Sequence, residues 1–175
     1  SDKEIDMFIA ISHGQHRGIL KRDFVDDRVK LIDKLTNKIS YNIFGYKNNP
    51  VWGQSFFDEL KKCTMAVNLS RGKPIKYYSS DRISSLLGNG LLTYIHEKYY
   101  YQDFFNNDEI ITYKNIRDLN NKIIFFKKHK KLAKKISKKG YIKSHRIFNN
   151  KLISNYIVNR SMNIKINNKE KWMNV

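Results

Sequence analysis

The sequence has little of several residue types that mark special classes of protein. Its 175 residues include one cysteine, Cys63, which cannot form an internal disulfide and fits a reducing compartment as a small buried residue. Two prolines and no glycine- or serine-rich run argue against a flexible internal linker. The apolar runs span only a few residues, so we expect neither a transmembrane helix nor a signal peptide. With 41% hydrophobic and 13% aromatic residues, we expect one packed core, and the single cysteine indicates a cytoplasmic location.

The common catalytic motifs are also missing. The sequence contains no G-x-S-x-G elbow, P-loop, G-x-G-x-x-G or H-E-x-x-H pattern. His13 and His16 stand three residues apart, but no cysteine, aspartate or glutamate completes a set at metal-ligand spacing, so we expect no metal site. These gaps argue against ordinary hydrolases and against sugar-nucleotide epimerases, which need the glycine fingerprint.

Acidic residues are scarce toward the C-terminal end. The formal net charge is +18, and residues 121–175 carry +15 of it, from fourteen lysines and two arginines against the single acid Glu170. Three explanations fit this segment: solvated lysine faces, contact with an anionic membrane, or contact with nucleic acid. A general enrichment in lysine, asparagine and isoleucine favours the first, and nucleic acid is the least favoured. A nucleic-acid module would use the basic residues of 127–143, in particular Lys127, Lys128, Lys130 and Lys131.

Short apolar runs that alternate with amphipathic segments indicate the fold class. The runs predict strands at residues 7–12, 41–44, 65–69, 91–95 and 109–113. Apolar residues at three- and four-residue steps predict helices near residues 25–39, 55–62, 81–87, 116–126, 132–136 and 142–157, with Gly140 ending the fifth. This alternation is typical of an α/β protein, here a parallel sheet with helices on both faces, followed by C-terminal helices. We expect one domain over residues 1–160 and a tail or helix over residues 161–175.

Two loops that follow predicted strands carry residues suited to binding an anion. Ligands of parallel sheets sit at the carboxyl ends of the strands. In the first loop Gly14 allows a close backbone approach and Arg17 can face a phosphate, although an ordinary basic surface loop would look the same. After the third strand, Asn68 and Arg71 stand where they could reach the same anion.

A third group of this kind lies at the start of the helix predicted over residues 81–87. Ser79 and Ser80 leave free backbone N–H groups and add hydroxyls, and Arg82 follows within the first turn. The helix dipole adds about half a positive charge. Helix capping alone would explain both serines equally well. The convergence of three such groups on one sheet edge predicts a phosphate-binding site.

The order and spacing of residues 77–120 resemble a known enzyme family. In that family a Ser/Thr-x-Arg helix start is followed by a glycine, a Leu-Leu-Thr strand, an acidic strand and a further helix. The matching residues here are Ser80-Asp81-Arg82, Gly90, Leu91-Leu92-Thr93, Asp108-Glu109-Ile110, Tyr113 and Asp118-Leu119. The chain is thus similar to the C-terminal, donor-binding domain of GT-B glycosyltransferases, in the spore-maturation-type branch of the group-1 transferases.

The resemblance implies a Rossmann-like domain that binds a nucleoside-diphosphate sugar as its substrate, without a cofactor or a metal. Together with the strand-end residues above, the set that would hold the diphosphate is Gly14, Arg17, Asn68, Arg71, Ser79, Ser80 and Arg82. The residues that would contact the base and the ribose are Gly45, Tyr46 and Lys47.

The resemblance also implies a role in cell-envelope polysaccharide biosynthesis. We expect a separate N-terminal domain, outside this sequence, to bind the acceptor, which would be a glycan, a lipid-linked glycan or a protein. That domain or the interdomain cleft would supply any general base, so the isolated fragment is expected to be inactive. The basic helices could hold the enzyme on the cytoplasmic face of the inner membrane.

One part of the family pattern is absent. Many group-1 retaining enzymes carry two glutamates, eight positions apart, that contact the sugar and the ribose. Counted back from Gly90, those positions hold Tyr77 and Ser85. Neither is a carboxylate, so the sequence predicts no catalytic residue and leaves open whether the configuration is retained or inverted.

Overall fold

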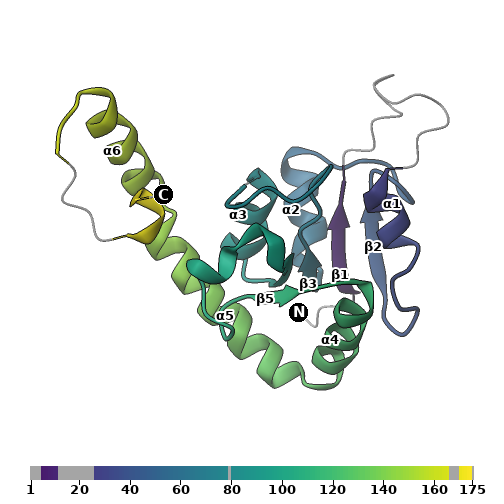
Figure 1. The fold of residues 1–175 in the computed structure, drawn as a ribbon. Helices are drawn as coiled ribbons and strands as arrows, with labels where there is room; N and C mark the ends of the chain where they lie inside the picture. The colour runs from purple at the N-terminus through teal and green to yellow at the C-terminus, as the bar shows by residue number, and fades with distance from the viewer. Residues whose placement is uncertain (1–4, 12–25, 79, 166–169, 175) are drawn as a thin grey trace.

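The computed structural model describes residues 5–11, 26–78, 80–165 and 170–174 (Figure 1). Five strands form one sheet: β1 (Ile5–Ala10), β2 (Tyr41–Phe44), β3 (Cys63–Val67), β4 (Leu92–His96) and β5 (Ile111–Tyr113). Their order is β2-β1-β3-β4-β5, and every neighbouring pair is parallel. Since β1 lies between β2 and β3, the chain crosses over at this point, where parallel sheets commonly bind ligands.

Helices cover both faces of the sheet. They are α1 (Asp27–Ile32), α2 (Gly53–Lys61), α3 (Asp81–Gly88), α4 (Ile116–Lys128), α5 (Lys130–Ile147) and α6 (Asn150–Ser161), with short 3₁₀ turns η2 (Glu97–Tyr99), η3 (Tyr101–Asp103) and η4 (Lys171–Asn174). Met7 and Ile9 pack with α1 and α4, whereas Phe8 between them packs with α2 and α3. This alternation buries β1 on both faces, and the predicted α/β Rossmann-like fold is confirmed.

The structure corrects two predicted helix boundaries. Gly140 does not end a helix but lies inside α5, which runs on to Ile147. A Cβ at Gly140 would lie 2.2 Å from the carbonyl oxygen of Glu109, so a close approach between α5 and the chain before β5 requires the glycine. The first predicted helix is also too long. It ends at Ile32, and the turn that follows is held by Asn120, whose side chain accepts from Thr36 N at 2.9 Å.

A partly buried ion pair joins the amino edge of the sheet to the end of α4. Lys127 Nζ lies 2.5 and 2.6 Å from the two carboxylate oxygens of Asp6 on β1. Ser40 donates to the same carboxylate from its backbone N–H and its hydroxyl, both at 3.0 Å. Lys127, one of the four lysines considered for nucleic acid, therefore has a structural role.

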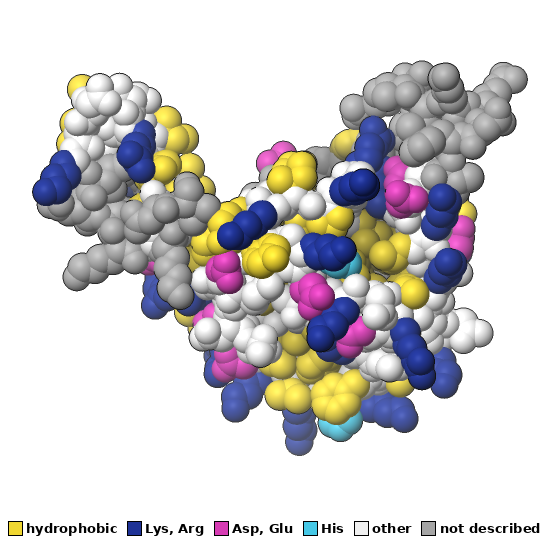
Figure 2. Space-filling model, viewed as in Figure 1, with side chains coloured by type: hydrophobic (Ala, Val, Ile, Leu, Met, Phe, Trp, Pro, Cys, Tyr) yellow, Lys and Arg dark blue, Asp and Glu magenta, His cyan; other side chains and the backbone are white. Residues whose placement is uncertain are grey.

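The last long helix, α6, extends away from the sheet (Figure 1), and none of its described residues is buried. Figure 2 shows lysine and arginine side chains along the lower margin of the molecule, over α4 and α5. No helix in the described part of the chain is both long enough and apolar enough to cross a membrane.

Candidate functional site

The carboxyl edge of the sheet brings together polar atoms that have no hydrogen-bond partner. Asn68 follows β3, and Ser80 is the N-cap residue of α3, yet its hydroxyl makes no capping bond there. Within the described residues, three buried side-chain oxygens lack any partner: Asn68 Oδ1, Ser70 Oγ and Ser80 Oγ. Buried polar atoms are nearly always paired, so these three oxygens mark this edge as a place where a polar group could bind.

Arg82 places a cation at the same edge. It lies in the first turn of α3, and its Nη1 donates to the carbonyl of Leu69 at 2.6 Å, which ties α3 to the loop after β3. Burial lowers the pKa of the guanidinium, and the charge of nearby Arg28 lowers it further. A guanidinium has five N–H donors and Arg82 uses one among the described residues, so an anion could engage the others.

A buried carboxylate holds two more arginines beside this position. Asp26 caps α1 by accepting from Arg28 N at 2.9 Å, and it accepts from Arg28 Nε at 3.0 and 3.1 Å and from Nη2 at 2.5 Å. Arg71 Nε lies 3.8 Å from the same carboxylate. Burial would raise the pKa of Asp26, but the hydrogen bonds from Arg28 outweigh it and the pKa lies below its usual value. Arg28 and Arg71 thus share the Asp26 carboxylate, and Arg82 lies close enough to Arg28 for its pKa to be affected by that charge. We call this set, Asp26, Arg28, Arg71 and Arg82, the arginine cluster.

The structure unites part of the predicted phosphate set. Asn68, Arg71, Ser80 and Arg82 lie at one edge, around the loop after β3 and the start of α3. Gly14, Arg17 and Ser79 lie outside the described residues. The predicted phosphate set did not include Asp26, Arg28 or Ser70. The Asp-x-Arg spacing at the predicted helix start was a usable signal, because an aspartate cap and an arginine two residues later can pair.

The residues predicted for the base and ribose form a separate turn after β2. Gly45 has φ +80°, and a Cβ there would lie 1.8 Å from the carbonyl oxygen of Ile11, just past β1. The hydroxyl of Tyr46 donates to Asp33 at 3.0 Å, and Lys47 Nζ lies 3.8 Å from the same carboxylate. Both side chains are therefore anchored at the far end of α1, while the Gly45 backbone stays close to the end of β1.

The two positions that lack the family glutamates have different surroundings. Tyr77 has φ +60°, which is strained for a residue with a side chain, and its hydroxyl donates to Asp103 Oδ2 at 2.7 Å. Its backbone N–H donates to the carbonyl of Tyr99 at 3.0 Å. Ser85 instead donates to the carbonyl of Asp81 within α3. The side chain at the first position is therefore in contact with a carboxylate of η3, whereas the one at the second position bonds only within α3.

Comparison with known proteins assigns the chain to a family. The model of the glycosyl transferase-like family matches residues 25–155, from the start of α1 into α6, a span that includes the whole arginine cluster. No curated protein matches the chain. The match covers more than half of the sequence and agrees with the parallel sheet and with the resemblance read from residues 77–120. The chain belongs to the glycosyl transferase-like family, and this membership supports a glycosyltransferase function.

Proposed function

We propose that this domain binds the diphosphate of a nucleoside-diphosphate sugar at the arginine cluster and helps to transfer the sugar to an acceptor. The acceptor would be a glycan, a lipid-linked glycan or a protein. The observation that carries this proposal is that Arg28, Arg71 and Arg82 gather at the edge where three buried oxygens have no partner among the described residues. A diphosphate is an anion that would engage both, because its oxygens accept from arginine and from serine hydroxyls.

The same arrangement suits the chemistry of the transfer. When the bond between the sugar and the diphosphate breaks, the leaving phosphate oxygen keeps the electron pair and gains negative charge. Fixed cations and the N-terminal end of α3 stabilise that charge more than they stabilise the intact donor. Arginine is suited to this role because its planar fork matches two phosphate oxygens at once. The proposed mechanism therefore assigns leaving-group stabilisation to this chain and needs no metal ion for it.

Other parts of the proposed enzyme come from outside this chain. In a GT-B arrangement a second domain faces the carboxyl edge of the sheet and binds the acceptor. No histidine, aspartate or glutamate of the arginine cluster is free to act as a base, because Asp26 is held by two arginines. We propose that the general base belongs to that second domain or to the cleft, and that this chain alone binds donor but turns over little.

A thermal-shift screen tests the proposal directly. The chain is heated with inorganic pyrophosphate and with UDP, GDP, dTDP and CMP, each as the nucleotide and as its sugar conjugate. A ligand at 100 times its Kd stabilises a protein by about 2.7 kcal/mol, which gives a clear rise in Tm. We expect pyrophosphate and one nucleotide series to raise Tm equally with and without EDTA. If neither pyrophosphate nor any nucleotide does so, the proposed function is wrong.

Exposed apolar side chains on basic helix α5 favour peripheral membrane association as an addition to this function. Leu132 is 40% exposed and Ile142 55% exposed on a helix that carries lysines around both. Such residues insert into the interface while lysines contact anionic headgroups. In a flotation assay we expect binding to anionic vesicles and none to neutral ones; equal binding to both would exclude an electrostatic anchor.

A further inference from the structure

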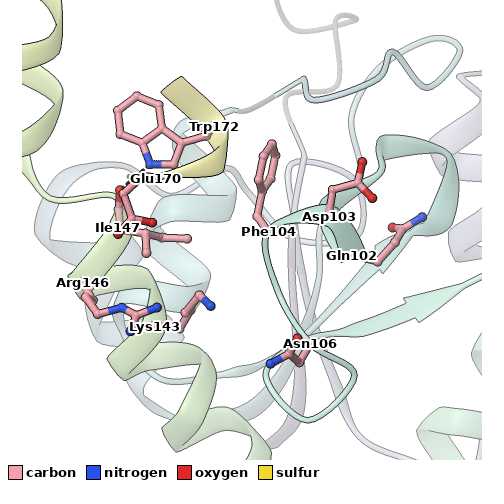
Figure 3. A pocket seen from close by; sticks show the side chains of 9 residues that line it. All are labelled: Gln102, Asp103, Phe104, Asn106, Lys143, Arg146, Ile147, Glu170 and Trp172. Carbon is pink, nitrogen blue, oxygen red and sulfur yellow. Dashed lines mark hydrogen bonds between the residues drawn. The ribbon is translucent and has the colours of Figure 1, made fainter. Parts of the chain in front are cut away.

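A cavity lies beside η3, and none of the residues of the arginine cluster lines it. Its volume is about 370 Å³, at the lower end of the usual range for ligand pockets. Phe104 and Asn106 line it on the η3 side, Arg146 lines it from α5, and Trp172 of η4 borders it from above (Figure 3). None of these residues has a part in the diphosphate site, so the cavity needs its own explanation.

The charges around this cavity balance. Lys143 and Arg146 of α5 face it on one side, and Asp103 and Glu170 belong to the same lining. A phosphate there would meet two carboxylates as well as two cations, so the cavity does not favour an anion. A hydroxyl group both donates and accepts, and it can pair with carboxylates and cations alike. A neutral ligand with many hydroxyls fits this lining best.

Several polar groups of the lining are available to a ligand. The Asn106 amide, the Arg146 guanidinium and the Glu170 carboxylate make no side-chain hydrogen bond or ion pair with the described residues. Lys143 has only a loose partner, Glu109, at 3.8 Å. Together they offer both donors and acceptors around one space.

The two aromatic rings of the lining are held in place by other parts of the fold. Trp172 Nε1 donates to the carbonyl of Ile147 at 2.8 Å, and its ring lies 5.7 Å from that of Phe148. The Phe104 ring lies 4.9 Å from Tyr77 and 6.3 Å from Phe148. In Figure 3 the two rings stand on opposite sides of the opening. Fixed aromatic surfaces suit the C–H face of a sugar ring, because they bury apolar area with little loss of side-chain entropy.

The cavity is linked to the arginine cluster through Tyr77. This residue contacts Phe104 and donates to Asp103, and Ser80 at the start of α3 follows only three residues later. Three residues span at most about 10 Å, which is the scale of one or two sugar units. The strained φ of Tyr77 and its bond to Tyr99 fix this link.

We propose that the cavity between η3 and α5 is a saccharide-binding site that works beside the diphosphate site. Asn106, Arg146 and Glu170 hydrogen-bond the sugar hydroxyls, and Phe104 and Trp172 contact the apolar face of the ring. The inference rests on the proposed function, because the sugar is either that of the donor or the terminal unit of the acceptor.

The test uses the fluorescence of Trp172. The chain has two tryptophans, and Trp52 is 60% exposed at the start of α2, so Trp52→Phe leaves Trp172 as the only reporter. This variant of the full chain is titrated with glucose, galactose and N-acetylglucosamine. We expect at least one to shift the emission with a Kd of about 1 mM, and Asn106→Ala and Arg146→Ala to weaken it about tenfold each.

A lysine on the same helix provides the control. Lys138 of α5 is exposed and makes no side-chain hydrogen bond or ion pair with the described residues. Lys138→Ala therefore removes a charge as Arg146→Ala does, and should leave the Kd within about twofold. The Tm of each variant verifies that it folds. The proposal is wrong if no sugar shifts the emission, or if the Asn106 and Arg146 variants bind like the parent. Pyrophosphate binding is measured in parallel, so that a failed cavity is distinguished from a failed diphosphate site.

Adding the sugar nucleotide that raises Tm in the screen identifies the source of the saccharide. If it competes with the free sugar, the cavity holds the donor's sugar. If both bind together, the cavity holds a unit of the acceptor. Each result supports a saccharide site and decides which substrate occupies it.

Discussion

Two buried aspartates at opposite edges of the sheet have very different surroundings. Asp6, on β1, is paired with one cation, Lys127, and with both donors of Ser40. Asp26, after the carboxyl end of β1, is paired with Arg28 and approached by Arg71, while Arg82 stands close enough to Arg28 to feel its charge. At the first edge one cation and the donors of Ser40 satisfy the carboxylate. At the second edge three arginines gather near one carboxylate, and three buried oxygens have no partner among the described residues.

The comparison shows why total charge says little about where this protein binds an anion. The net charge is +18, but much of it lies on exposed lysines or on lysines that already have acidic partners, such as Lys122 with Asp118 and Lys139 with Asp108. A closed pair such as Asp6–Lys127 stabilises the fold. The arginine cluster is suited to bind an anion instead, because a ligand could pair with the guanidinium groups and with the buried oxygens that lack a partner among the described residues.

The largest effect is expected from Arg82→Ala. Truncating one partner of a buried, charge-assisted contact costs about 2–5 kcal/mol of binding, so affinity for pyrophosphate and for the donor should fall about a hundredfold. Stability should change little, because the variant also removes the repulsion between Arg82 and Arg28. Isothermal titration calorimetry measures the affinity and thermal unfolding the stability.

A matched arginine on another surface serves as the control for that variant. Arg160 lies on α6, exposed over the Tyr156 ring at 5.6 Å. Arg160→Ala removes the same charge far along the chain from α3 and should leave pyrophosphate affinity unchanged. If both variants weaken binding equally, general charge and not the arginine cluster holds the anion.

The sequence alone predicted the parallel sheet and several of the residues at its carboxyl edge, but not the pairing of Asp6 with Lys127. The strands were found because short apolar runs between turn residues have few other interpretations. The prediction that a helix ends at Gly140 was wrong, because the glycine is required for close packing against the backbone of Glu109. That contact joins segments distant in the chain and is not visible in the sequence. Asn68, Arg71, Ser80 and Arg82 could be named because strand ends and helix starts are visible in the sequence. The hydrogen bond between Tyr77 and Asp103 could not be predicted from the sequence, since it joins residues 26 positions apart through the packing of η3.

Substitutions at the Asp6–Lys127 pair are expected to lower the stability of the fold and to leave anion binding unchanged. Lys127→Met leaves the Asp6 carboxylate without its cation and should lower the free energy of unfolding by about 1–2 kcal/mol. A fully buried pair would lose more, but Lys127 is 38% exposed and water partly replaces it. Pyrophosphate should bind as to the parent chain. Urea unfolding of the double variant Asp6→Asn, Lys127→Met should recover part of the loss; no recovery would mean that the lysine stem, not the charge, stabilises this edge.

The pH dependence of stability gives a smaller, more specific effect. Burial would raise the pKa of Asp6, but hydrogen bonds from Lys127 and Ser40 outweigh it, so the pKa in the folded chain lies below its usual value. A depressed carboxyl pKa contributes stability above the unfolded value of about 3.9, and this contribution is lost as pH falls through the folded value. The parent should therefore be more stable than Asp6→Asn at pH 7, and the difference should shrink below about pH 4. A difference that stays constant across urea unfolding curves at these pH values would contradict an ionic role.

The smallest effect on stability is expected at the turn after β2, where we predict that the nucleotide base binds. The Tyr46 hydroxyl donates to Asp33 at the surface, so Tyr46→Phe should change the free energy of unfolding by less than about 0.5 kcal/mol. If the ring packs on the nucleotide base, Tyr46→Phe should keep nucleotide affinity and Tyr46→Ala should weaken it, while both bind pyrophosphate like the parent. Equal affinity of both variants for the nucleotide would show that the base does not pack on the Tyr46 ring.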